Sequence, residues 1–181
     1  IDSDGDLDFL ALRLEEGAIP ANKNNAPSTS SLYNNNRDGS FTDIAEKLGL
    51  AFPETAIAAI VYDDFDNDRD LDLVLFPSGD HTPICWVNDR IWEYHILDAQ
   101  SSGLLAHHVL AATSGDPDKD GDRDLLLFTK EGLKLYTNTD GFKFESHKQF
   151  AQTNGRLGGT SGQFVDMDND GDLDIIIADA F

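Results

Sequence analysis

Aspartates recur at alternate positions in three stretches of the chain, a spacing that suits metal binding. The stretches read DFDNDRDLD at 64–72 (loop A), DPDKDGDRD at 116–124 (loop B) and DMDNDGDLD at 166–174 (loop C). Two carboxylates about 4 Å apart repel by about 1 kcal/mol in water and by about 4 kcal/mol at an effective dielectric constant near 20. A tight turn that holds several of them therefore favours a cation among them, although a single such cluster fits a splayed, solvated loop equally well.

Loop positions are numbered here from 1 to 9, beginning with the first Asp of each loop. Side chains at positions 1, 3 and 5 can curl towards one centre, position 7 can offer its backbone carbonyl, and the Asp at position 9 can close the shell. Gly at position 6 permits the positive φ of a sharp turn, and Arg69 replaces it in loop A. Six to eight oxygen ligands of this kind predict Ca²⁺, at three sites and a fourth that is truncated at the N-terminus. The candidate ligands are Asp64, Asp66, Asp68, Asp70, Asp72, Asp116, Asp118, Asp120, Asp122, Asp124, Asp166, Asp168, Asp170, Asp172 and Asp174, with Asp2, Asp4, Asp6 and Asp8 in the truncated copy.

The near-constant spacing of the loops indicates a repeated structural unit. Loops A, B and C begin at residues 64, 116 and 166, which are 52 and 50 residues apart. A period of this length is typical of stacked supersecondary units, as in propellers or solenoids. Such regularity is not expected of unrelated solvated loops.

Short apolar runs flank each loop and predict buried strands. AIAAIV and LVLF surround loop A, and runs rich in Val, Ile, Leu and Phe surround the other two loops. In each of the first three units an aromatic–Asn element follows the second apolar run, at 32–41, 85–94 and 135–144. Two of these elements contain Asp-Gly, at 38–39 and 140–141, which is a strong hairpin signal. Residues 41–50 are expected to form one helical turn.

Four short antiparallel strands per unit predict an all-β fold, a β-propeller of four-stranded blades. The expected blades cover residues 1–57, 58–110, 111–160 and, incompletely, 161–181 of a single partial propeller. An EF-hand is excluded because position 12 would be Leu75, Leu127 or Ile177, inside a strand, where that motif needs Glu. Nonapeptide β-helix repeats are excluded because the chain has no run of their glycine-rich motif.

The loops resemble the FG-GAP/VCBS repeats of integrin-α-type β-propellers, whose calcium loops read D-x-D-x-D-G-x-x-D between two strands. The element at 32–50 resembles the subgroup associated with ASPIC/UnbV domains. The resemblance implies a propeller of about seven blades, of which about three and a half are present. The remaining blades would come from a longer chain or a partner subunit. The resemblance also implies a non-enzymatic extracellular module for adhesion or for binding protein or carbohydrate on the propeller face. In such a module the calcium ions are structural.

Composition narrows the partners and the location. The 181 residues include 34 acids and 13 bases, a formal charge of −21, which argues against nucleic acid and anionic membranes as partners. No apolar run approaches the ~18 residues of a membrane span.

The single cysteine, Cys85, permits no internal disulfide and is expected to be buried. Calcium modules outside cells bind at about 10⁻⁴–10⁻³ M, so we expect a secreted, cell-surface or periplasmic protein. A chain that opens at Ile1 within an acidic motif suggests processing or a fragment.

Two other functions compete with adhesion. A propeller polysaccharide lyase or hydrolase would need a catalytic set, but the five histidines show no Ser-His-Asp or Cys-His spacing, and calcium already accounts for the carboxylates. A calcium-dependent structural or assembly component of a cell-surface complex fits the acidic charge equally well. For the adhesion or ligand-binding module, the long polar loop at 15–31 is a candidate contact surface. The histidines are His81, His95, His107, His108 and His147, with His107 and His108 expected at the start of a strand.

Overall fold

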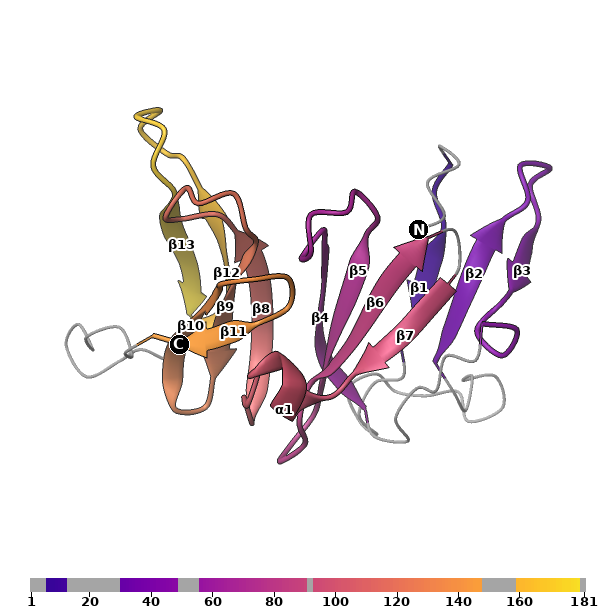
Figure 1. Ribbon diagram of the computed structural model, residues 1–181, viewed down its shortest axis with the longest axis horizontal. Helices are drawn as coiled ribbons and strands as arrows, with labels where there is room; N and C mark the ends of the chain where they lie inside the picture. Colours follow the sequence, from indigo (N-terminus) through magenta and orange to yellow (C-terminus); the bar gives the residue numbers. More distant parts are fainter. Residues whose placement is uncertain (1–5, 13–29, 49–55, 91–92, 148–158, 180–181) are drawn as a thin grey trace.

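The computed structural model describes residues 6–12, 30–48, 56–90, 93–147 and 159–179, and they form four antiparallel sheets arranged side by side (Figure 1). Every strand pairs with its neighbour in sequence, so each sheet is a simple meander. The first sheet contains β1 (Phe9–Ala11), β2 (Ser31–Asn35) and β3 (Phe41–Asp43). The second contains β4 (Ile57–Asp63), β5 (Asp72–Pro77), β6 (Ile84–Arg90) and β7 (Glu93–Leu97). The third contains β8 (Val109–Gly115), β9 (Asp124–Thr129), β10 (Gly132–Asn138) and β11 (Phe144–Ser146), and the last contains β12 (Gly159–Val165) and β13 (Asp174–Asp179).

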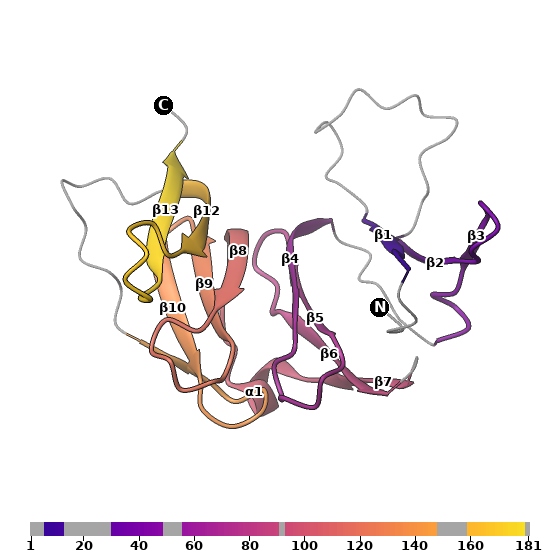
Figure 2. The ribbon, with the colours of Figure 1, turned by 90° about the horizontal axis from the view of Figure 1, so that it is seen from above.

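These sheets confirm the all-β fold of blade-like, four-stranded antiparallel units. Strands β4, β8 and β12 begin successive units and lie next to one another, with the rest of each sheet running outwards from them (Figure 2). The blade limits expected at residues 57, 110 and 160 stay predictions. Most of the long loop at 15–31 lies outside the described residues.

The second strand of each four-stranded unit is buried on both faces. Alternate side chains of a strand point to opposite faces, so Leu73 and Leu75 of β5 pack in one core and Val74 and Phe76 in another. Strand β9 behaves in the same way: Leu125 and Leu127 pack in one core, and Leu126 and Phe128 pack in another. Burial on both sides explains why these strands appear in the sequence as continuous apolar runs rather than as alternating patterns.

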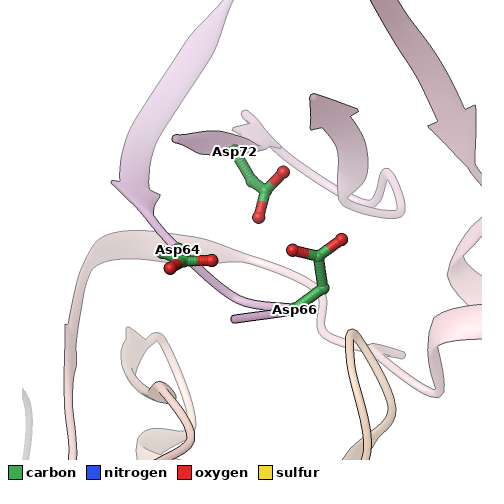
Figure 3. Close-up of side chains that lie close together, drawn as sticks. All are labelled: Asp64, Asp66 and Asp72. Carbon is green, nitrogen blue, oxygen red and sulfur yellow. The ribbon is translucent and has the colours of Figure 1, made fainter. Parts of the chain in front are cut away.

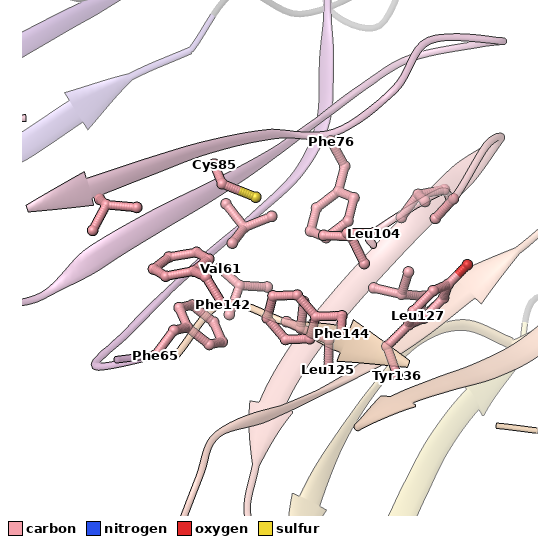
Figure 4. Close-up of a cluster of buried hydrophobic side chains, with 14 residues drawn as sticks. Val61, Phe65, Phe76, Cys85, Leu104, Leu125, Leu127, Tyr136, Phe142 and Phe144 are labelled. Atoms are coloured by element: carbon pink, nitrogen blue, oxygen red, sulfur yellow. The ribbon is translucent and has the colours of Figure 1, made fainter. Parts of the chain in front are cut away.

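The largest core lies between the second and third sheets (Figure 4). Phe65 of loop A packs against Phe142 and Phe144 from the hairpin that joins β10 to β11, with ring centroids 5.2 Å and 5.8 Å away. Cys85 is fully buried in the same core, as predicted, and burial raises the pKa of its thiol to about 12. The apolar contacts that hold the chain together therefore lie between units as well as within them. The buried members are Val61, Phe65, Val74, Phe76, Cys85, Val87, Leu104, Ala106, Val109, Leu125, Leu127, Tyr136, Phe142 and Phe144.

Both Asp-Gly hairpins are confirmed. Gly39 and Gly141 take φ values of 88° and 48° in the turns between β2 and β3 and between β10 and β11. The helical turn expected at 41–50 is confirmed only in part: Phe41–Asp43 form β3, and a single turn follows in which the Leu48 N–H donates to the Ile44 carbonyl at 3.0 Å. Residues 49 and 50 lie outside the described residues.

Two local features differ from the prediction. A short helix, α1 (Ala99–Ser102), lies between β7 and β8, and the side chain of Asp98 caps its first N–H groups. His107 and His108 precede β8 instead of starting it, and His108 has a φ of 52°, which no strand residue adopts. No helix among the described residues is long and apolar enough to cross a membrane.

Candidate metal sites in the acidic loops

The three acidic loops join the first and second strands of their units and share one backbone conformation. In each loop the N–H of position 6 donates to the carboxylate of position 1, at 3.1, 3.2 and 3.0 Å in loops A, B and C. The N–H of position 7 donates to the carboxylate of position 5 at 2.8, 2.9 and 2.8 Å. These bonds hold the carboxylates of positions 1 and 5 against the backbone of the loop.

Two residues of each loop adopt the left-handed conformation. Position 6 has φ values of 78°, 97° and 90°, which Gly121 and Gly171 adopt without strain, and Arg69 adopts at about 1–2 kcal/mol. Position 4 has a φ of 61° or 62° in all three loops, a feature that we did not predict. Two of its three residues are Asn, which tolerates this region better than most residues.

Three aspartates converge in each loop. One ligand atom from each member lies within 4.8 Å of those of the other two. Figure 3 shows the carboxylates of Asp64, Asp66 and Asp72 facing a common space. The groups combine positions 1, 3 and 9 in loop A but positions 1, 3 and 5 in the other loops. They are Asp64, Asp66 and Asp72; Asp116, Asp118 and Asp120; and Asp166, Asp168 and Asp170.

The loops fit a bound cation because one carboxylate oxygen in each is buried without a protein partner. Oδ1 of position 1, in Asp64, Asp116 and Asp166, is inaccessible to solvent and accepts no hydrogen bond. Buried polar atoms are nearly always paired, and an ionised oxygen is the costliest to leave unpaired. The same atom is buried in all three loops, beside carboxylates that converge on it, so each loop could hold a metal ion.

The Asp at position 9 has a further contact, with the backbone of its own unit. Asp72 accepts hydrogen bonds from the N–H groups of Phe65, at 3.0 Å, and of Asn88 on β6, at 2.8 Å. Asp124 accepts from Asn138 on β10 at 2.8 Å. Burial raises the pKa of Asp72 to about 7 and that of Asp124 to about 6. Position 9 therefore ties the acidic loop to the third strand of the sheet.

The Asn of the aromatic–Asn element donates the hydrogen bond that connects position 9 to the third strand, a role that we did not predict. Asn35, Asn88 and Asn138 each lie two residues after an aromatic side chain and donate their backbone N–H to the position-9 Asp. The Asn side chains also bond to the loops: Asn88 donates to the Leu71 carbonyl at 3.3 Å. The recurrence of Asn two residues after Tyr or Trp was the available signal.

The other candidate ligands at positions 3, 5 and 9 differ in whether they belong to the converging groups. Asp168 bonds within its turn, accepting the Asp170 N–H at 3.3 Å. Asp174 accepts from the Met167 N–H at 3.1 Å and lies outside the group in loop C. Asp68 is not a member of the group in loop A, and Asp118 and Asp120 belong to that of loop B.

The side chains at position 7 lie outside the converging groups. Asp122 and Asp172 each bond to the preceding loop, and Asp70 holds the same position in loop A.

The truncated copy at the N-terminus is described only in part. Asp2 and Asp4 lie outside the described residues. Asp6 pairs with the Arg37 guanidinium at 2.9 Å, and Asp8 accepts the Asn35 N–H at 3.0 Å. Asp8 thus has the same backbone contact as its counterparts at position 9, which aligns this copy with the complete loops.

His95 and His107 lie beside aspartates that are not part of the acidic loops. His95 Nδ1 lies 2.5 Å from Asp89, and His107 Nδ1 lies 3.1 Å from Asp80, both at exposed surfaces. The expectation that the chain is not an enzyme stays a prediction.

Antiparallel blade-like sheets with an acidic loop between the first two strands define a repeat protein of the β-propeller type. The family model for the FG-GAP-like repeat matches residues 1–75 and 116–177, which include all the acidic loops. The chain therefore belongs to the FG-GAP-like repeat family. Among curated proteins, none matches it.

Proposed function

We propose that the chain is a non-enzymatic extracellular β-propeller module that holds one Ca²⁺ in each of loops A, B and C. The observation that carries this proposal is the buried, unpaired Oδ1 of Asp64, Asp116 and Asp166 in three loops of one conformation. The bound ion neutralises the repulsion among the converging carboxylates. It thereby stabilises the connection between the first and second strands of each blade.

The donor set favours calcium over other common ions. The loops offer carboxylate and carbonyl oxygens and contain neither His nor Cys, the ligands that distinguish zinc sites. Calcium accepts six to eight oxygens in flexible geometry, whereas Mg²⁺ demands a near-ideal octahedron and keeps several waters. The converging group combines positions 1, 3 and 9 in loop A but positions 1, 3 and 5 in loops B and C. Calcium, with its flexible coordination geometry, fits both arrangements better than magnesium does.

The extracellular location follows from calcium supply, since weak sites fill only where calcium is abundant. Within the family, the element at 32–50 supports the ASPIC/UnbV-associated subgroup. The blades then present loops for adhesion to a protein or carbohydrate ligand, with further blades supplied by a longer chain or a partner subunit. The charge of −21 speaks against nucleic acid.

A thermal melt with excess Ca²⁺, with Mg²⁺ and with chelator tests the metal proposal. Binding to the folded state alone adds about 2.7 kcal/mol per site at a concentration a hundredfold above the dissociation constant. We therefore expect a large rise in melting temperature with calcium and a much smaller one with magnesium. Identical melts in all three solutions would mean that the loops are solvated acid.

Asp168→Ala is expected to lower the melting temperature in calcium and to leave it nearly unchanged in chelator. The Asp168 carboxylate is a member of the group in loop C, and among the described residues it accepts one long hydrogen bond, from the Asp170 N–H of its own exposed turn at 3.3 Å. Glu145→Gln, which removes one exposed negative charge from β11, is the matched control and should behave alike in both solutions. Equal destabilisation by Asp168→Ala with and without calcium would refute its role as a ligand.

A further inference from the structure

Consecutive acidic loops touch through two of their side chains. The side chain at position 4 of one loop bonds to the carboxylate at position 7 of the next loop. Asn67 of loop A donates its amide N–H to Asp122 of loop B at 2.6 Å. The ammonium of Lys119 in loop B donates a hydrogen bond to the carboxylate of Asp172 in loop C. Position 4 has the same left-handed φ of 62° in both loops, so the two side chains leave equivalent points of the backbone.

The two contacts differ in charge. Asn67 is neutral, whereas Lys119 brings a fixed positive charge to the edge of loop C. The ammonium lies 3.7 Å from where a Cβ on Gly171 would be, in the middle of that loop. The carboxylate of Asp172, followed by those of Asp170 and Asp166, raises the pKa of Lys119 above its usual range. Two of these three acids belong to the converging group of loop C, so the ammonium acts on the same carboxylates as a bound ion.

We propose that the residue at position 4 of one loop sets the cation affinity of the next loop, and that Lys119 lowers the affinity of loop C for calcium. This inference rests on the calcium function proposed above. A tethered ammonium repels an incoming divalent ion and neutralises part of the negative charge that attracts it. For charges several ångströms apart in a largely aqueous setting, Coulomb's law gives an effect of about three- to tenfold in affinity. The loops are therefore graded in affinity by contacts across the blades.

Calcium titrations followed by two-dimensional ¹H–¹⁵N NMR resolve the loops individually. The N–H groups of Gly121 and Gly171 bond to the position-1 carboxylates of loops B and C, so each amide reports on its own loop. The variants are Lys119→Asn, which copies the neutral donor found in loop A, Lys119→Met, which removes the donor as well, and the reciprocal Asn67→Lys. Lys130→Asn is the matched control, because it removes one exposed positive charge at the far end of β9.

Both Lys119 variants should move the Gly171 midpoint to about three- to tenfold lower calcium and leave that of Gly121 in place. Asn67→Lys should move the Gly121 midpoint to higher calcium by a similar factor, and Lys130→Asn should move neither. The differences should shrink as salt is added, because these charges are exposed and screened.

Three results would overturn the inference. If Gly171 titrates at the same calcium concentration in the natural chain and both Lys119 variants, the ammonium has no effect. If only Lys119→Met moves the midpoint, a lost hydrogen bond and not charge is responsible. If neither glycine responds to calcium in the natural chain, the proposed calcium function fails, and this inference fails with it.

Discussion

Asp72→Ala is expected to destabilise the chain by roughly 2–4 kcal/mol in chelator as well as in calcium. The buried N–H groups of Phe65 and Asn88 both donate to this carboxylate, and each buried donor left without an acceptor costs about 1–3 kcal/mol. Burial of the Asp72 carboxyl group is itself unfavourable, and it raises the pKa of that group to about 7. Removing the carboxyl group therefore offsets part of the lost stability. Urea denaturation in both solutions measures the effect.

Asp70→Ala is the matched control for this prediction. Asp70 lies two residues earlier in the same loop, outside the converging group, and its loss leaves the bonds between loop A and β6 intact. We expect Asp70→Ala to cost well under 1 kcal/mol in chelator, within the range of surface substitutions. A loss for Asp72→Ala that appears only in calcium would show that this residue is a ligand and does not tie the loop to the sheet.

Phe65→Ala is expected to cost about 3–5 kcal/mol, again with and without metal, as large-to-small substitutions of buried aromatic residues do. Phe65 is fully buried, and its ring packs on Phe142 and Phe144 of the following unit. The substitution leaves a cavity between the second and third sheets. It also removes the side chain that anchors position 2 of loop A in the core. Denaturation in urea should also reveal a broader transition if the units then separate, because cooperativity depends on the contacts between them.

Met167→Ala provides the comparison, because Met167 holds the same loop position as Phe65. Met167 is 67% exposed, so its truncation should change stability by no more than about 0.5 kcal/mol. Similar losses for Phe65→Ala and Met167→Ala would mean that packing between the second and third sheets contributes little to stability.

The contacts between units are polar as well as apolar. Ser114 on β8 donates to the Asp63 carboxylate on β4 at 2.7 Å, and Arg123 of loop B lies 3.4 Å from the same carboxylate. Together with the bonds at loop positions 4 and 7, these contacts place a polar network along the edge that carries the acidic loops.

Much of the fold could be predicted from the sequence because its signals are local. Apolar runs such as Leu73–Phe76, the Asp-Gly turns and the regular return of the acidic loops depend on residues close in sequence, and all three predictions were confirmed. Helix α1 was missed because it is four residues long, too short for a helical pattern, although Asp98 and Gly103 are ordinary signals for its start and its end.

The sequence by itself determined the acidic loops, their period and the all-β character of the chain. Only the tertiary structure decided what each Asp contacts, since identical spacing leads to different partners. Asp172 meets an ammonium where Asp122 meets an amide, and Phe65 is buried where Met167 is exposed. The partners of Asp172, Asp122 and Phe65 belong to a neighbouring unit, about 50 to 80 positions away in the sequence, and are brought near only when the sheets pack together. No pattern within one repeat can report on them.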